Sequence, residues 1–390
     1  MFGLFIDILK EKNPKLIQAA LSLHTNGIIM PDSYIIDVDI FKENAELIKA
    51  ESDKHNINLY YMTKQIGRNP YLAKILEDLG YSGAVAVDFK ETEVLMKNNL
   101  KLGNTGHLVQ IPSKMIGKVL EYGTEIMTVY SFEKACEISE EAEKLGIIQD
   151  IMFRILDEKS SIYPGQEAGI DLCDLEDITK KILTLKNVRI NGLTSFPCFL
   201  YNETNHAIEK TENIEVILKA YNILKEKFNI EVKELNLPSS TCVENIKMIK
   251  RNQGTHGEPG HALTGTTPFH INRQAVEKPA YVYVSEISHN FRGKSYFYAG
   301  GYYRRSHMKN VLTGSSYENL TKINTEDFDP SNIDYYLGLS KEQKIGDTVL
   351  GCFRTQFFVT RSDIILVKGI QNEKPEIVGR YTALGERIEV

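Results

Sequence analysis

Cysteine is scarce in this sequence and shows none of the spacings that mark metal or disulfide sites. The chain has five cysteines among 390 residues, at positions 136, 173, 198, 242 and 352, and no two of them form a C-x-x-C pair. An odd number of scattered cysteines argues against both a zinc site and a disulfide scaffold. We therefore expect no metal and a protein of the reducing cytoplasm.

Clusters of basic charge and long apolar runs are also missing. The chain has 46 basic and 52 acidic residues and a net charge of −6, and its basic residues are spread out. This pattern argues against a nucleic-acid partner. No run approaches the about 18 apolar residues of a membrane span. The first residues carry an acid, Asp7, inside an apolar run and lack a basic start, so we expect no secretion signal.

Between about residues 57 and 260, short β-rich runs alternate with longer segments of helical period. This order is typical of parallel strands joined by helices, and eight repeats close into a barrel. The chain is also long enough for two domains. We predict strands over residues 57–64, 83–88, 107–112, 126–131, 150–156, 188–196, 232–238 and 253–257, and helices that include 70–79, 113–121, 131–145, 174–183, 213–227 and 242–251.

After about residue 268 the helical period gives way to β-rich runs, which predict a second domain of β structure. We assign residues 33–268 to the barrel domain, and residues 1–32 with 269–390 to an N-terminal extension and the C-terminal β domain. The segment 33–39 precedes the barrel, and we allow that it pairs with the C-terminal domain. The fold class is therefore α/β, a (β/α)8 barrel followed by a β-rich domain.

Polar residues at the ends of barrel strands are the candidates for chemistry, because barrel active sites lie there. Lys64 ends the first predicted strand, where desolvation would favour the neutral, nucleophilic amine. Position alone also fits a lysine that marks the strand's exit into solvent. Glu258, in the run Gly-Glu-Pro-Gly-His at the end of the eighth strand, places a carboxylate at the barrel mouth, although Pro-Gly pairs also occur in ordinary turns.

Together these residues resemble the fold-type III pyridoxal-phosphate (PLP) enzymes, which include alanine racemases and the ornithine and diaminopimelate decarboxylases. The resemblance covers most of the chain, from Tyr-Ile-Ile-Asp-Val-Asp at 34–39 through Lys64 to Phe-Arg-Ile at 153–155 and Glu-Pro-Gly-His at 258–261. The nearest overall likeness is to the YhfX-like group of alanine-racemase-related proteins. It implies that Lys64 forms the Schiff base with the cofactor.

The resemblance also implies a cofactor-binding set. Glu258 would pair with the pyridine nitrogen and deepen the electron sink for a Cα carbanion. Gly260 and the turn of Ser239, Ser240 and Thr241 would bind the phosphate. Further members would be Arg154, near the cofactor ring, and His261, which stands where the decarboxylases have arginine.

In this fold class each active site of a dimer borrows residues from the partner's β domain. Tyr302 or Cys352 would then be the acid that faces Lys64 across the substrate. A half-buried strand tyrosine and a buried small hydrophobe are the competing interpretations of these two residues. Other histidines, such as His107 and His256, lack metal-ligand spacing, and we treat them as structural.

The resemblance implies a homodimeric isomerase that racemises or epimerises a small amino acid. Because alanine racemases have arginine where Glu258 stands, a decarboxylase or lyase of the same fold is the second expectation. A non-catalytic PLP-binding protein is the third, although a carrier has little need of a second domain. The departures near Phe196 and His261 leave the substrate open.

Overall fold

The computed structural model describes residues 5–306 and 308–389, which form two compact units. The barrel unit comprises residues Ile48–Thr63 and Ala73–Gly260. The β unit comprises the chain up to Leu47, Lys64–Leu72 and the chain from His261 onward. No helix among the described residues combines the length and the apolar character that crossing a bilayer requires.

Eight parallel strands form the barrel, and the pairing of β5 with β6 closes it. The strand order is β5-β4-β3-β2-β12-β11-β8-β6. The predicted eight-stranded barrel is therefore confirmed. The strands are β2 (Asn58–Tyr61), β3 (Gly83–Ala86), β4 (Leu102–Thr105), β5 (Thr124–Val129), β6 (Gln149–Leu156), β8 (Val188–Thr194), β11 (Glu234–Asn236) and β12 (His256–Gly257).

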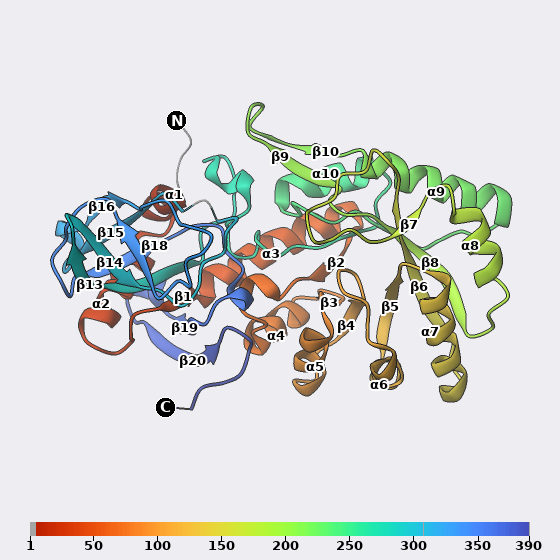
Figure 1. Cartoon of the computed structure of the whole chain (residues 1–390), viewed down its shortest axis with the longest axis horizontal. Coiled ribbons are helices and arrows are strands. Elements are labelled where there is room, and N and C mark those ends of the chain that lie inside the picture. The colour runs from red at the N-terminus through yellow and green to blue at the C-terminus, as the bar shows by residue number, and fades with distance from the viewer. Residues whose placement is uncertain (1–4, 307, 390) are drawn as a thin grey trace. The chain divides into compact units, whose positions relative to one another are not determined.

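Helices follow the barrel strands, and α5 to α8 lie along the outside of the barrel in Figure 1. Helix α7 begins after Ser131, whose side chain accepts a hydrogen bond from the Lys134 N–H, and ends at Gly146 in a left-handed conformation. All six helices that we predicted are present. The helices are α3 (Val38–His55), α4 (Pro70–Asp78), α5 (Phe89–Lys97), α6 (Ile116–Tyr122), α7 (Phe132–Leu145), α8 (Leu175–Ile182), α9 (Asn213–Phe228) and α10 (Val243–Arg251).

The third strand lies earlier than we predicted. It covers Leu102–Thr105, and the apolar run 107–112 that we assigned to it is a loop. The strand ends at Gly106, whose φ of 82° is outside the extended range. Glycine is required at this position, because a Cβ there would lie 2.8 Å from the Thr128 carbonyl oxygen. Gln110 then holds the loop by donating to the carbonyls of Gly106 and Thr128. Hydrophobicity alone did not distinguish this partly exposed apolar loop from a strand.

The β unit is built on a sheet in the order β16-β15-β18-β13-β1-β19-β20, which confirms the predicted β-rich domain. Strand β1 (Ser33–Asp37) pairs with β13 and β19, as we allowed. Residues 33–47, 64–72 and 261–268, which we assigned to the barrel domain, are grouped with the β unit. The other strands are β13 (Tyr281–Phe291), β14 (Lys294–Tyr298), β15 (Asn310–Gly314), β16 (Thr321–Asn324), β17 (Tyr336–Leu339), β18 (Thr348–Gly351), β19 (Asp363–Lys368) and β20 (Glu376–Thr382).

Remaining elements cover one face of that sheet or extend the barrel unit. Helices α1 (Phe5–Lys12) and α2 (Pro14–Thr25) supply apolar residues to the core of the β unit, together with β13, β15, β18 and β19. In the barrel unit, β7 (Ile170–Asp171) pairs with β6, and β9 (Phe199–Asn202) forms a hairpin with β10 (Ala207–Lys210).

Candidate active site

Glu258 directly follows strand β12, at the carboxyl end of the barrel strands. Its side chain is 3% exposed, and its Oε1 accepts a hydrogen bond of 2.6 Å from the Asn236 amide. Its backbone N–H donates to Thr241 Oγ1 over 3.0 Å. The Oε2 atom lies 3.8 Å from His107 Nε2. Asn236, Thr241 and His107 thus surround one buried glutamate at the barrel mouth.

Arg154, on strand β6, is a fully buried cation with spare donors. Its Nη2 donates to the Gln166 carbonyl oxygen over 2.8 Å, and its guanidinium lies 5.7 Å from the centre of the Tyr130 ring. Within the described ranges, its Nε and Nη1 atoms have no hydrogen-bond partner. A buried donor without a partner costs free energy, about 1–3 kcal/mol or more for a charged group. The site is therefore suited to an acceptor that the chain itself does not supply.

The turn from Ser239 to Thr241 follows strand β11. Ser239 and Ser240 have φ of 89° and 52°, a left-handed conformation that is uncommon for residues other than glycine. Such strained backbone is concentrated at ligand sites, and successive N–H groups in turns of this kind bind anions. Both serine hydroxyls are within hydrogen-bond distance of the Phe199 carbonyl oxygen, at 2.7 and 3.3 Å. The backbone and Thr241, rather than the two serine hydroxyls, therefore offer donors.

Lys64 starts a short 3₁₀ helix, Lys64–Ile66, two residues beyond Met62, and it is 7% exposed. Met62 itself belongs to the barrel unit, where its N–H donates to the Pro259 carbonyl oxygen over 3.0 Å. Thr63 is fully buried and donates to the Glu91 carboxylate. Both residues before Lys64 thus form hydrogen bonds, and these restrict the position of the Lys64 backbone.

His261 follows Gly260 and is buried in the β unit. In the part of the chain that the structure describes, neither ring nitrogen has a hydrogen-bond partner. Burial, and then the positive charges of Arg354 and Lys64, hold the pKa of this imidazole well below its usual range. His261 is therefore neutral at physiological pH, unlike the decarboxylase arginine at this position.

The two candidate acids differ in their surroundings. Tyr302 is half-buried, its ring lies 4.2 Å from that of Phe328, and burial raises the pKa of its hydroxyl. Cys352 lies in the apolar core of the β unit, and burial raises the pKa of its thiol far above the usual range. The surroundings of Cys352 are those of a small core residue.

Sequence reasoning missed two residues that contact Glu258. Asn236, at the end of β11, is fully buried and donates to Glu258. His107, which we had treated as structural, is also fully buried, and its ring lies 5.8 Å from that of Phe196. We placed His107 at the start of the predicted third strand, whereas it follows the observed one, so its contact with Glu258 was not expected. Asn236 was within our predicted seventh strand, and its contact with Glu258 depends on the inward direction of its side chain.

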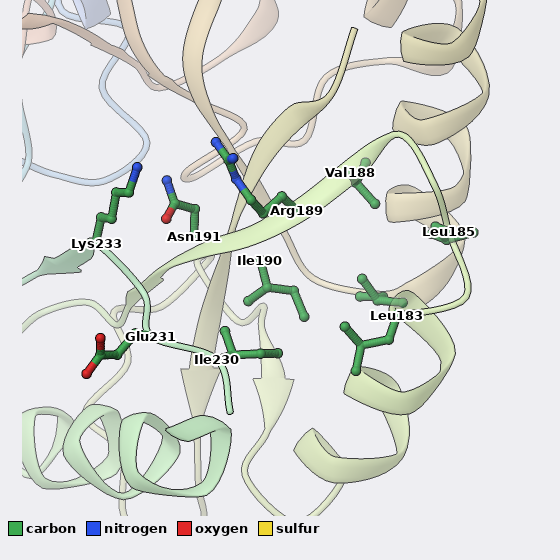
Figure 2. A pocket seen from close by; sticks show the side chains of 10 residues that line it. Leu183, Leu185, Val188, Arg189, Ile190, Asn191, Ile230, Glu231 and Lys233 are labelled. Carbon is green, nitrogen blue, oxygen red and sulfur yellow. The ribbon is translucent and has the colours of Figure 1, made fainter. Parts of the chain in front are cut away.

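A separate pocket of about 300 Å³ contains none of the predicted site residues. Figure 2 shows the apolar side chains of Leu183, Ile190 and Ile230 on one side of β8, and Arg189 and Asn191 on the other. This alternation is the normal period of a strand. Arg189 and Asn191 both hydrogen-bond to Asp150, so their polar groups are already used.

Two family models match the chain. The model described as alanine racemase, N-terminal domain, matches residues 36–268, and the model described as YhfX-like, C-terminal domain, matches residues 282–377. Among individual proteins, YhfX of Escherichia coli (strain K12) is 44% identical over 386 residues, which is 99% of this chain and all of that protein.

Several solved structures share the fold. Diaminopimelate decarboxylase of M. jannaschii superposes with a TM-score of 0.67 at 15% identity, covering 94% of this chain and 93% of that one. Alanine racemase of Clostridium difficile 630 in complex with cycloserine gives 0.64 at 17% identity, covering 90% and 98%. D-threonine aldolase of Filomicrobium marinum gives 0.65 at 13%, covering 90% and 95%. Three different reactions occur on this one fold, so the fold alone does not select among them.

Proposed function

Because the chain belongs to the family of the alanine racemase N-terminal domain, whose cofactor is pyridoxal 5′-phosphate, we propose that it is a PLP-dependent amino-acid racemase or epimerase. Its YhfX-like C-terminal domain completes the proposed enzyme. The single observation that supports a cofactor site at the barrel mouth is the buried pair of Arg154 donors, Nε and Nη1, which have no hydrogen-bond partner among the described residues.

The donor set at the barrel mouth fits this cofactor. PLP carries a phosphate, a phenolic oxygen and a pyridine nitrogen, which need donors at two places and a carboxylate at the third. The left-handed turn at Ser239 and Ser240, with Thr241, supplies donors for the phosphate, and Gly260 and His261 follow Glu258 along the chain. Arg154 supplies donors for a ring oxygen, and Glu258 supplies the carboxylate for the nitrogen.

The proposed reaction moves one proton at the substrate Cα. When bound, PLP withdraws electrons from Cα and so weakens the Cα–H bond. Lys64, three residues after strand β2, would hold the cofactor covalently and serve as the base on one face of the substrate. Glu258 would keep the pyridine nitrogen protonated, and Asn236, which donates to its Oε1, orients the carboxylate.

An acid on the opposite face would complete racemisation. We propose Tyr302 or Cys352 of the second subunit of a homodimer. Tyr302 is favoured because it is half-buried and carries a polar group, whereas Cys352 lies in an apolar core. Exchanging Tyr302 for Phe should slow exchange in one stereochemical direction more than in the other. Equal rates in both directions, for this variant and for Cys352→Ala, would refute the two-base assignment.

A decarboxylase or lyase is the second candidate, and Glu258 is the observation that favours it. A carboxylate at this position strengthens the electron sink, which is what the loss of carbon dioxide or of a β-substituent requires. The two reactions differ in whether the substrate keeps its mass.

The test starts with an absorbance spectrum of the purified protein with PLP, followed by borohydride reduction and peptide mapping. A pyridoxyl group on Lys64 is expected. A panel of amino acids in deuterated water then separates the reactions, since racemisation gives deuterium at Cα with retained carbon skeleton and inverted chirality. Loss of carbon dioxide or of a side-chain group would support the second candidate instead. A protein that binds PLP but exchanges no Cα proton would be a carrier.

We also propose that the enzyme acts in the cytoplasm. Its five cysteines are all free in the structure, and three of them are buried. Free thiols in this number are typical of proteins kept in a reducing compartment.

A further inference from the structure

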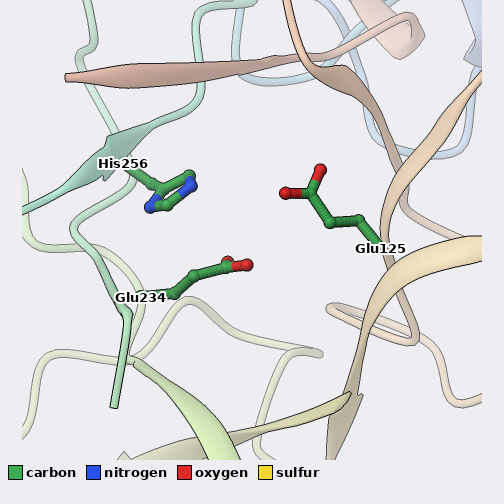
Figure 3. Close-up of side chains that lie close together, drawn as sticks. All are labelled: Glu125, Glu234 and His256. Atoms are coloured by element: carbon green, nitrogen blue, oxygen red, sulfur yellow. The ribbon is translucent and has the colours of Figure 1, made fainter. Parts of the chain in front are cut away.

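A second group of polar side chains lies at the amino ends of the barrel strands, opposite to the candidate active site. Glu125 is the second residue of β5, and Glu234 and His256 are the first residues of β11 and β12. One ligand atom from each residue lies within 4.8 Å of the other two, and Figure 3 shows the three side chains converging. Since β5 is not a neighbour of β11 or β12, these side chains meet across the barrel interior.

His256 has the surroundings of a metal-binding imidazole. Its side chain is 4% exposed, and its ring stacks on Tyr60 with 5.1 Å between the ring centres. Its Nδ1 lies 2.8 Å from Thr255 Oγ1, which itself accepts from the Leu235 N–H. Because the ring is buried, its neutral form is favoured. The other nitrogen, Nε2, lies 3.3 Å from Nδ2 of the exposed Asn58 side chain. Metal-bound histidines commonly donate their second N–H to an oxygen such as Thr255 Oγ1, and a metal ion at Nε2 would replace the long contact with Asn58.

An independent observation is that, among the described residues, the buried Glu234 carboxylate has one side-chain donor and no ion-pair partner. Glu234 is 5% exposed, and its two oxygens share the single Tyr60 hydroxyl, each at 3.1 Å. A carboxylate has about four acceptor positions, so most of them are open.

Within residues 5–306 and 308–389, no lysine or arginine forms an ion pair with Glu125 or Glu234. The charge of the exposed Lys101 acts on Glu125 without such a contact. Arg189 is used by Asp150, with N–O distances of 2.6 and 2.9 Å. The buried Glu234 therefore faces a second carboxylate and an imidazole without the ion-pair partner that buried carboxylates normally require.

We propose that Glu125, Glu234 and His256 bind one divalent transition-metal cation, Zn²⁺ in the first place, at the amino end of the barrel. One nitrogen and two carboxylate donors suit zinc, whereas Mg²⁺ and Ca²⁺ prefer all-oxygen sites. Ligands of a tetrahedral zinc lie about 3.3 Å apart, and the exposed Glu125 side chain has room to rotate to that distance. Water takes the fourth position, and the ion cross-links β5 to β11 and β12.

The test measures zinc bound to the full-length, PLP-loaded protein after treatment with a chelator. One zinc per chain should be retained through gel filtration, and saturating ZnCl₂ should raise the melting temperature by ~4 °C, the effect expected of a ligand at about a hundred times its dissociation constant. MgCl₂ at the same concentration should leave the melting temperature unchanged.

Matched variants locate the ion. Glu234→Gln and His256→Gln should weaken zinc binding at least tenfold and abolish the thermal shift. Glu231→Gln changes an exposed glutamate that pairs with Lys225 and should bind zinc as the parent does. Circular dichroism confirms that each variant folds, which is expected for Glu234→Gln because it removes a buried charge and keeps an acceptor for Tyr60. Cobalt substitution should give a spectrum without a thiolate charge-transfer band, which excludes the free cysteines as ligands.

Two results would overturn the proposal. The first is a parent protein that retains no zinc and shows no thermal shift, in which case Glu234 is neutralised by a proton. The second is a Glu234→Gln variant that binds zinc as tightly as the parent, in which case the ion lies elsewhere.

Discussion

The two ends of the barrel use the same eight strands to bury opposite kinds of polar group. At the carboxyl end, Arg154 presents donors without partners, and Glu258 is held by an amide. At the amino end, Glu125 and Glu234 present acceptors beside a neutral imidazole. One end is therefore suited to an anionic organic cofactor and the other to a cation.

The change from one environment to the other takes place within two residues of a strand. In β11, Glu234 faces the amino end and Asn236 contacts Glu258. Side chains two residues apart in a strand lie on the same face, about 7 Å apart. Barrel enzymes carry their chemistry at the carboxyl end, while residues at the amino end serve stability. The comparison thus predicts that substitutions at the carboxyl end of the barrel reduce activity, and that substitutions at the amino end reduce stability.

Lys64→Ala should have the largest effect, because it removes both the covalent link to the cofactor and a base. A positioned acid or base contributes about 10²–10⁴-fold, so Cα deuterium exchange should fall by at least ~10³-fold. Borohydride mapping should find no labelled peptide. Lys247→Ala, an exposed lysine on α10, is the control and should exchange at the parent rate. Residual labelling elsewhere in Lys64→Ala would move the cofactor lysine to another position.

Glu258→Gln should slow Cα exchange by ~10²-fold, since an amide cannot hold a proton on the pyridine nitrogen as a carboxylate does. The amide oxygen can still accept from Asn236, so the melting temperature should change little. Exchange rates measured at saturating PLP separate this effect from weaker cofactor binding. An unchanged rate would show that the carboxylate has a structural role only. It would also contradict the prediction that changes at the carboxyl end of the barrel reduce activity.

Arg154→Met should weaken PLP binding by about tenfold, equivalent to one lost charge-assisted hydrogen bond. The PLP-free variant should nevertheless be no less stable than the parent, because methionine replaces a buried cation that has two unpartnered donors. Fluorescence titration with PLP and urea unfolding measure the two quantities. A variant that is strongly destabilised without PLP would mean that the arginine supports the fold itself.

Gly103→Ala should lower stability by ~2 kcal/mol without direct loss of a polar group. A Cβ at this position would lie 2.4 Å from the Tyr60 ring, which stacks on His256 and donates to Glu234. Urea unfolding measures the loss. Gly338→Ala is the control, because its Cβ would lie 3.1 Å from the flexible Glu326 side chain and at an ordinary contact distance of 3.6 Å from the Tyr296 ring. If Gly103→Ala were as stable as the parent, the Tyr60 ring would have room to move, and the amino end would not be closely packed.

Much of the carboxyl end could be predicted from sequence, because its signals are local. The strand-helix alternation predicted the barrel. Lys64 and Glu258 could be proposed because Glu258 directly follows strand β12 and Lys64 lies three residues after β2. The error at the third strand arose because an apolar loop and a buried strand have the same composition, and Gly106 was not recognised as the stop.

The sequence by itself determined the fold class and the residues that follow the strands, since hydrophobic periodicity and the order of strands and helices are local properties of the sequence. Only the tertiary structure decided which side chains face one another. His107 and Glu258 are 151 positions apart, and Glu125 and His256 are 131 apart, so no spacing rule links them. Barrel closure brings strands that are distant in sequence around one interior, and whether a buried polar group finds a partner depends on that closure.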